Sequence, residues 1–150
     1  MAVKPVPDGH HTVTPYLVAT DAQAVIDFAT KAFNATVVED MRRPDGAVMH
    51  AELQIGDSRI MLGQASGQHP AMPAALYLYV PDADATYRQA LAAGGISTME
   101  PTDMFYGDRN AGVRDTNGNM WWIGTHIEDV ARDELQRRAN EEMKRRAAVS

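Results

Sequence analysis

The stretch that decides the fold is residues 49–63, which read MHAELQIGDSRIMLG. Apolar and polar side chains alternate on both sides of Gly56-Asp57, as they do in two strands joined by a tight turn. A two-residue turn places Glu52 opposite Met61. One face then carries Ala51, Leu53, Ile55, Ile60 and Leu62, and the other carries His50, Glu52, Gln54, Arg59 and Met61. The sequence therefore predicts a sheet with one face in a core and a polar opposite face.

The same pattern recurs later in the chain. A shift of 61 residues brings the Gly56-Asp57 turn onto Asn117-Gly118, a dipeptide typical of hairpins. The shift also brings Asp21 onto Asp82, and each of these acids follows an apolar run and precedes an apolar helical stripe. We therefore predict two copies of one unit, each made of a strand, a helix and three strands.

This repeat sets the expected organisation of the chain. It predicts module one at about 12–63, a linker at 64–74, module two at about 75–126 and a charged C-terminal helix at about 128–147. The module helices are expected at 22–33 and 83–93. The predicted fold class is a single α+β domain, in which two βαβββ modules form a cupped mixed sheet around a small-molecule pocket.

Composition excludes several classes of function. The chain has 150 residues, a formal net charge of −6 and no cysteine, so a disulfide framework and a thiol nucleophile are both excluded. Acids match most of the basic residues, which argues against a nucleic-acid partner. No segment resembles a signal peptide or approaches the roughly 20 apolar residues of a membrane span. We expect a cytoplasmic protein without a membrane partner.

The polar faces admit two interpretations. Solvent exposure alone would account for His50 or Glu52. However, the repeat places Trp122 and Met120 on the equivalent face of module two, as Met61 lies on that of module one. A large aromatic side chain and methionines beside a few polar groups are typical of a ligand cavity, although an aromatic stripe is also common in an ordinary core.

Several motifs are shared with a known family. They are His11-Thr12-Val13-Thr14-Pro15-Tyr16-Leu17, Ile26-Asp27-Phe28, Ala32-Phe33, Met49-His50-Ala51-Glu52-Leu53, Ile55-Gly56-Asp57-Ser58, Phe105-Tyr106-Gly107-Asp108-Arg109, Arg114-Asp115, Gly118, Trp121 and Thr125-His126. In these motifs the chain resembles the vicinal oxygen chelate superfamily, which includes glyoxalase I, the bleomycin-resistance proteins and extradiol dioxygenases, and within it the PhnB-like branch. The resemblance implies paired βαβββ modules and a homodimer whose clefts bind the ligand.

In metal-dependent members, the first and last strands of each module supply the metal ligands. The corresponding residues here are Thr14, Met61, Ala75 and Trp122. A divalent metal site of this kind needs about three oxygen or imidazole donors, which these residues do not provide. We therefore expect no cofactor and no metal at the usual site.

A substitute cluster of His50, Glu52 and His126 is the remaining place for a displaced metal or for an acid/base pair, if the sheets bring these residues together. His50 and Glu52 are accordingly the catalytic candidates. His10, His11 and His69 lie in a tail and a linker and are expected to have no functional role.

The ligand-contact candidates come from both modules. They are Tyr16, His50, Glu52, Arg59, Met61, Tyr77, Tyr79, Phe105, Tyr106, Arg109, Met120, Trp122 and His126. The PhnB-like pattern implies that Phe105 and Tyr106 lie at the mouth of the cleft. Arg109 either braces this loop together with Asp108 or meets an anionic group of the ligand.

Two functions from different classes follow. The leading hypothesis is a non-catalytic protein that sequesters an apolar or aromatic molecule such as a natural product, as the resemblance to bleomycin-resistance members implies. The alternative is a lyase, isomerase or dioxygenase that uses His50 and Glu52 or a displaced metal. A domain with a vestigial pocket is a third reading, because function resides in sites rather than in folds.

Overall fold

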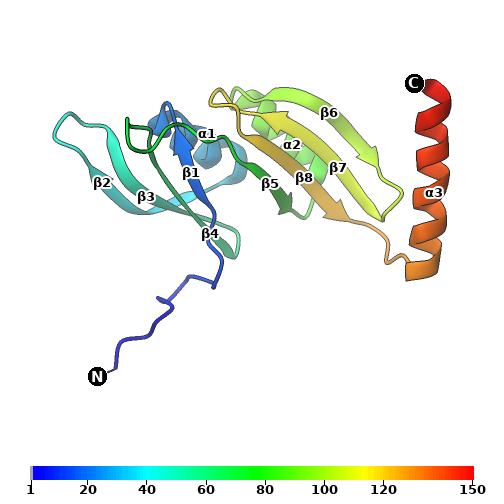
Figure 1. The fold of residues 1–150 in the computed structure, drawn as a ribbon, viewed down its shortest axis with the longest axis horizontal. Coiled ribbons are helices and arrows are strands. Elements are labelled where there is room, and N and C mark those ends of the chain that lie inside the picture. Colours follow the sequence, from blue (N-terminus) through cyan, green and yellow to red (C-terminus); the bar gives the residue numbers. More distant parts are fainter. Residues whose placement is uncertain (1) are drawn as a thin grey trace.

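The computed structural model describes residues 2–150, which form two similar halves followed by a helix (Figure 1). The first half contains β1 (Tyr16–Ala19), α1 (Ala22–Phe33), β2 (Thr36–Arg42), β3 (Val48–Ile55) and β4 (Ser58–Gln64). The second half contains β5 (Ala75–Tyr79), α2 (Ala83–Ala92), β6 (Ile96–Asp103), β7 (Asp108–Arg114) and β8 (Met120–His126), and α3 (Arg132–Val149) ends the chain.

Each half is a four-stranded mixed sheet with the same topology. Sheet A has the order β1-β4-β3-β2, and sheet B has the order β5-β8-β7-β6. The first and last strands of each half are parallel neighbours, and the remaining pairs are antiparallel. The α+β fold predicted from the repeat, with two βαβββ modules, is confirmed.

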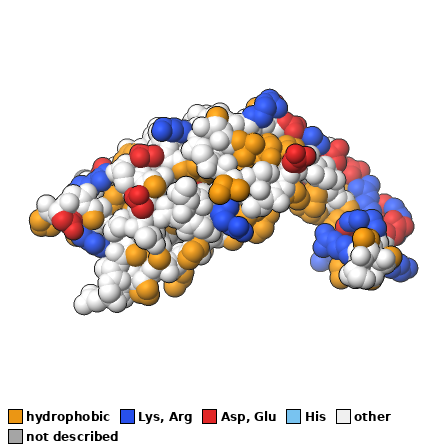
Figure 2. Space-filling model, turned by 90° about the horizontal axis from the view of Figure 1, so that it is seen from above, with side chains coloured by type: hydrophobic (Ala, Val, Ile, Leu, Met, Phe, Trp, Pro, Cys, Tyr) orange, Lys and Arg blue, Asp and Glu red, His pale blue; other side chains and the backbone are white. Residues whose placement is uncertain are grey.

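The register of the first hairpin is the predicted one. Glu52 pairs with Met61, and Gln54 pairs with Arg59. Ala51 and Leu53 are fully buried, because the apolar face of the sheet packs under α1. We call the opposite face of each sheet its open face. Figure 1 shows the two sheets side by side with α1 and α2 behind them, and Figure 2 shows the arched outline of the molecule.

The helices begin and end at the expected signals. The Asp21 carboxylate accepts a hydrogen bond from the Ala24 amide at 3.2 Å, and the Asp82 carboxylate accepts one from the Ala85 amide at 3.1 Å. Each bond satisfies an amide that has no partner within the helix. Asn34 ends α1 with a left-handed φ of 55°.

The two halves share one core, and an indole lies at their junction. Trp121 on β8 is fully buried, and its ring centroid lies 5.0 Å from that of Phe33 and 6.1 Å from that of Phe28, both on α1. The second half therefore contributes its largest core side chain to the helix of the first half.

The C-terminal helix lies outside this core and has no buried residue. It begins at Arg132, four residues later than the expected 128, because the backbone amides of Ile127 and Glu128 both donate to the Gly107 carbonyl. Arg138 attaches the helix to the domain through Glu128 and the carbonyl of Phe105.

The cap of α2 gives a test of this fold. Replacing Asp82 with Ala leaves the Ala85 amide unpaired and should lower the free energy of unfolding by about 1 kcal/mol, measured by urea denaturation. The matched Asp82→Asn variant keeps a capping oxygen and should stay close to the original stability. Equal losses in both variants would contradict the capping role.

Candidate ligand-binding site

Four polar side chains form a hydrogen-bonded chain on the open face of sheet A. The Tyr16 hydroxyl lies 3.2 Å from His50 Nδ1, and His50 Nε2 lies 3.0 Å from Glu52 Oε2. The other Glu52 oxygen lies 2.6 Å from His10 Nε2. Burial raises the pKa of Glu52, but the hydrogen bonds from His50 and His10 outweigh it and leave the pKa below its ordinary value. Glu52 is therefore an anion at neutral pH with both oxygens engaged.

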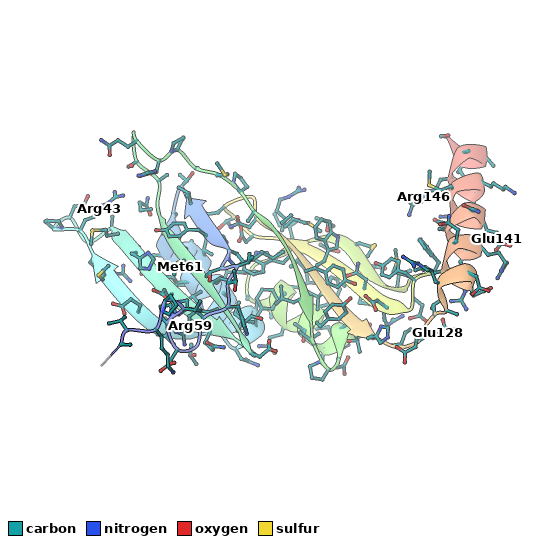
Figure 3. The ribbon with its side chains drawn as sticks, turned by 60° about the horizontal axis from the view of Figure 1, so that its bottom comes forward. Arg43, Arg59, Met61, Glu128, Glu141 and Arg146 are labelled. Atoms are coloured by element: carbon teal, nitrogen blue, oxygen red, sulfur yellow. The ribbon has the colours of Figure 1, made fainter. Side chains whose placement is uncertain are left out.

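His10 is the member of this chain that the sequence interpretation missed. Its side chain is only 11% exposed, because the N-terminal segment crosses the open face of sheet A. Gly9, with a φ of 85°, lies directly against the guanidinium of Arg59, which Figure 3 labels beside the blue N-terminal segment. No periodicity in the tail signals this contact, so the sequence pattern offered no means of finding it.

A second polar cluster lies on the open face of sheet B, around the buried carboxylate of Asp108. The hydroxyls of Tyr77 and Tyr79 both donate to Asp108 Oδ2, at 2.8 and 3.1 Å. Nδ1 of His126 lies 2.9 Å from Oδ1, and its Nε2 lies 2.7 Å from an oxygen of Asp129. Every hydrogen-bonding partner of the Asp108 carboxylate among residues 2–150 is thus a tyrosine or a histidine.

These contacts shift the pKa values of the cluster. Burial raises the pKa of Asp108, but the hydrogen bonds from His126, Tyr77 and Tyr79 outweigh this and lower it overall. Burial, followed by the hydrogen bond to Asp108, raises the pKa of Tyr77. Hydrogen bonds to Asp108 and Asp129 raise the pKa of His126. The cluster therefore favours an ionised Asp108, a protonated His126 and neutral tyrosines.

The two open faces share one feature of the repeat. A side chain at Gly63 on β4 would lie 3.1 Å from the Tyr16 hydroxyl, and one at Gly124 on β8 would lie 2.7 Å from the Tyr77 hydroxyl. In each half, a tyrosine of the first strand thus covers a glycine of the last strand. The glycine at this equivalent position of each half therefore leaves space for the phenol ring of the tyrosine.

Arg109 lies on the helix side of sheet B, because it alternates along β7 with the open-face residue Asp108. Its guanidinium binds both oxygens of Asp84 on α2, at 2.8 and 3.1 Å, and it also binds Asp103 at 2.9 Å. It braces β7 against the helix and β6, with Asp84 and Asp103 as partners in place of the expected Asp108. Phe105 and Tyr106 form an edge-to-face pair, with ring centroids 5.3 Å apart.

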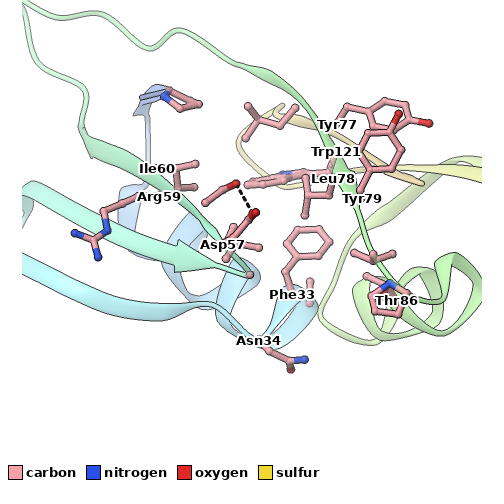
Figure 4. A pocket seen from close by; sticks show the side chains of 18 of the residues that line it. Phe33, Asn34, Asp57, Arg59, Ile60, Tyr77, Leu78, Tyr79, Thr86 and Trp121 are labelled. Carbon is pink, nitrogen blue, oxygen red and sulfur yellow. Dashed lines mark hydrogen bonds between the residues drawn. The ribbon is translucent and has the colours of Figure 1, made fainter. Parts of the chain in front are cut away.

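A cavity lies at the junction of the two halves, and its volume of about 600 Å³ is typical of a ligand pocket. We call it the junction cavity. Phe33, Ile60, Leu78 and Trp121 provide apolar walls, as Figure 4 shows. Of the predicted ligand contacts, only Arg59, Tyr77 and Tyr79 line it. Tyr16, His50, Glu52 and Met61 lie instead on sheet A, and Tyr106, Met120, Trp122 and His126 belong to sheet B or its loop.

The structure does not provide the donors of the family's usual metal site. Thr14 precedes β1, Met61 and Trp122 lie on separate sheets, and Ala75 has no donor atom in its side chain. Within residues 2–150, no group of three or more His, Asp or Glu side chains has an arrangement that would hold a metal ion. The substitute cluster does not assemble either, because His126 bonds to Asp108 and Asp129 rather than approaching His50 and Glu52.

The pKa of Asp108 leads to a test by pH. An Asp whose pKa is lowered by folding stabilises the protein above its unfolded pKa of about 3.9, and this contribution disappears as the pH falls through the lower folded value. Asp108→Asn should therefore destabilise the protein by about 1–3 kcal/mol at pH 7 and by progressively less below about pH 4, in urea unfolding series. An equal loss at every pH would contradict the charged interaction, and Asp129→Asn serves as the exposed control.

Comparison with known proteins places these features in a family. Residues 9–123 match the model of the Glyoxalase/Bleomycin resistance protein/Dioxygenase superfamily. An uncharacterized protein of Mycobacterium bovis is 35% identical over 135 residues, which cover 83% of this chain and 89% of the relative. Within residues 2–150, no helix is both long enough and apolar enough to cross a membrane.

Solved structures agree with the fold. TioX from Micromonospora sp. ML1 aligns with a TM-score of 0.66 at 22% identity, over 78% of this chain and 99% of that protein. The PhnB protein from Bacillus cereus, described as a putative 3-demethylubiquinone-9 3-methyltransferase, aligns with a TM-score of 0.61 at 19% identity, over 77% and 99% of the two chains. The chain belongs to the Glyoxalase/Bleomycin resistance protein/Dioxygenase superfamily.

Proposed function

We propose that this protein binds an apolar or aromatic small molecule, such as a natural product, in the junction cavity and does not transform it. The observation that carries the proposal is the cavity itself, which has the volume of a ligand site and walls that include Phe33, Leu78 and Trp121. Burial of a planar ligand against these side chains would supply most of the binding free energy.

The two polar clusters support binding rather than chemistry. Both oxygens of Glu52 are held by imidazoles, and Asp108 accepts bonds from two phenols and an imidazole. A general base needs an oxygen within reach of the proton that it removes. Neither carboxylate presents such an oxygen. We also propose membership of the PhnB-like branch, which the likeness to the Bacillus cereus protein supports.

The two indoles give a test of the site. Trp121 lines the junction cavity, whereas Trp122 lies on the opposite face of β8, and these are the only tryptophans of the chain. In the Trp122→Phe variant all indole fluorescence comes from Trp121, so titration with a panel of uncharged aromatic compounds should still change the emission. Loss of the response in this variant, when the original protein responds, would place the ligand on sheet B and contradict the junction cavity.

A second candidate function rests on the chain of hydrogen bonds on sheet A. Tyr16 is half-exposed at one end of this chain, and Glu52 and His10 lie behind His50. Such an arrangement suits proton transfer in a lyase or an isomerase. His50→Ala should then abolish turnover of a substrate, whereas in a binding protein it would alter only the affinity for ligand.

We further propose that the protein functions as a homodimer. Large apolar side chains are exposed on and around sheet A, including Met41, Met49 and Val38, and exposed apolar patches commonly mark interfaces. Light scattering coupled to gel filtration should give about twice the chain mass of 16.4 kDa. A mass of one chain at micromolar concentration would contradict the proposal.

A further inference from the structure

We propose that the open face of sheet B holds a second site, beside the junction cavity, that binds a small organic ammonium group. This ammonium site consists of Tyr77 and Tyr79 on β5, which also line the edge of the junction cavity, Asp108 and Asn110 on β7, and Trp122 on β8. This site goes beyond the proposed binding of an apolar ligand, because it would distinguish ligands by their charge and not by their apolar surface.

The first step of the argument is charge. Asp108 is buried, and within residues 2–150 no Lys or Arg forms an ion pair with it. Its cationic partner is His126, which Asp129 shares. The neighbouring guanidinium of Arg109 is bound to two other carboxylates. Two carboxylates thus share one imidazolium, which leaves the cluster with one net negative charge when His126 is protonated and with two when it is neutral.

The second step is that the cluster has unused acceptors and few free donors. Tyr77 and Tyr79 both donate their hydroxyl protons to Asp108, so the Tyr79 oxygen is left to accept, while Tyr77 also has the Tyr106 hydroxyl as a hydrogen-bonding neighbour. The side-chain amide of Asn110 donates to the Tyr106 hydroxyl at 3.2 Å. The other end of this amide, Oδ1, is buried and has no hydrogen-bonding partner in the described chain, and Asn110 as a whole is only 3% exposed.

An unpaired acceptor of this kind is informative. Leaving a buried polar atom without a partner costs about 1–3 kcal/mol, so such atoms are rare and call for a donor from outside the described chain, such as a water or a ligand. Asn110 lies two residues from both Asp108 and Gly112 along β7, and it therefore shares the open face with both. A ligand N–H group is the complement of an unused amide oxygen beside a buried carboxylate.

The third step is the aromatic surface. The rings of Tyr77 and Tyr79 lie 5.1 Å apart, and Tyr79 is 68% exposed. Trp122 is the neighbour of Tyr77 across the β5–β8 pairing, and across β7–β8 it pairs with Gly112, beside which the side chains of Thr98 and Met120 fill the space. Faces of tyrosine and tryptophan rings attract cations. The negative charge of the cluster would repel an anionic ligand, which would also find acceptors where it needs donors. An ammonium group would donate hydrogen bonds to these acceptors and would be attracted by the negative charge.

The test uses three probes that share one aromatic body: 2-phenylethylamine, which is charged at neutral pH, 2-phenylethanol and 3-phenylpropionate. Each is titrated into the ¹⁵N-labelled protein while NMR follows the indole of Trp122 and the side-chain amide of Asn110. We expect the ammonium probe to bind about tenfold more tightly than the alcohol and to shift both signals, and the carboxylate to bind weakest.

Three variants test which side chains bind the ammonium probe. Tyr79→Phe removes one acceptor from an exposed side chain, so folding is preserved, and the affinity for the ammonium probe should fall about threefold or more. Asp108→Asn removes the charge and should abolish the preference for the ammonium probe. Tyr87→Phe is the matched control, because its hydroxyl bonds to Ser97 behind the sheet, and it should leave the affinity unchanged.

Three results would overturn the inference. Equal affinity for the three probes would contradict selection by charge. Equal effects of Tyr79→Phe and Tyr87→Phe on the affinity for the ammonium probe would contradict the role of Tyr79 in the site. A shift of the Trp121 indole without one at Trp122 would place the probe in the junction cavity. Each of these results would leave the proposed binding of uncharged aromatic molecules intact, since that is measured separately through Trp121 fluorescence. If the Asp108 variant does not fold, Tyr79→Phe and the three probes still decide the question.

Discussion

The buried carboxylate of Asp115 is the contact on which the junction of the two halves depends. It accepts four hydrogen bonds, from the amides of Asn117 and Asn119, the Asn119 side chain and the Trp121 indole. The first three close the turn that joins β7 to β8, and the fourth orients the indole that packs on α1. One carboxylate therefore shapes a local turn and also positions the side chain that joins the two halves and lines the junction cavity.

Local rules explain which features the sequence predicted well. The hairpin around Gly56-Asp57, the caps at Asp21 and Asp82 and the left-handed Asn34 each depend on residues that are close in the chain. Strand alternation also separated Trp121 from Trp122 correctly, since one faces the helices and the other faces away. These features have short-range causes, so composition and spacing were sufficient to find them.

The candidate site was less predictable because it depends on contacts between distant segments. His10 meets Glu52 across 42 residues, and Arg109 meets Asp84 across 25. The junction cavity is lined by residues from the end of α1, the β3–β4 turn and β5, and no periodicity encodes how these distant segments meet. Strand alternation named most of the open-face residues, but it could not show that their polar groups are bonded to one another, nor that the junction cavity lies elsewhere.

The C-terminal helix illustrates how loosely one element can be joined to a stable domain. No side chain of α3 is fully buried, and the helix carries its own ion pairs, such as Glu134–Arg138 and Glu142–Arg146, together with one arginine that bonds to Glu128. Exposed pairs of this kind are weakened by salt. Because α3 contributes no residue to the core of the two halves, a fluorescent label or a surface linker attached to this helix would leave that core unchanged.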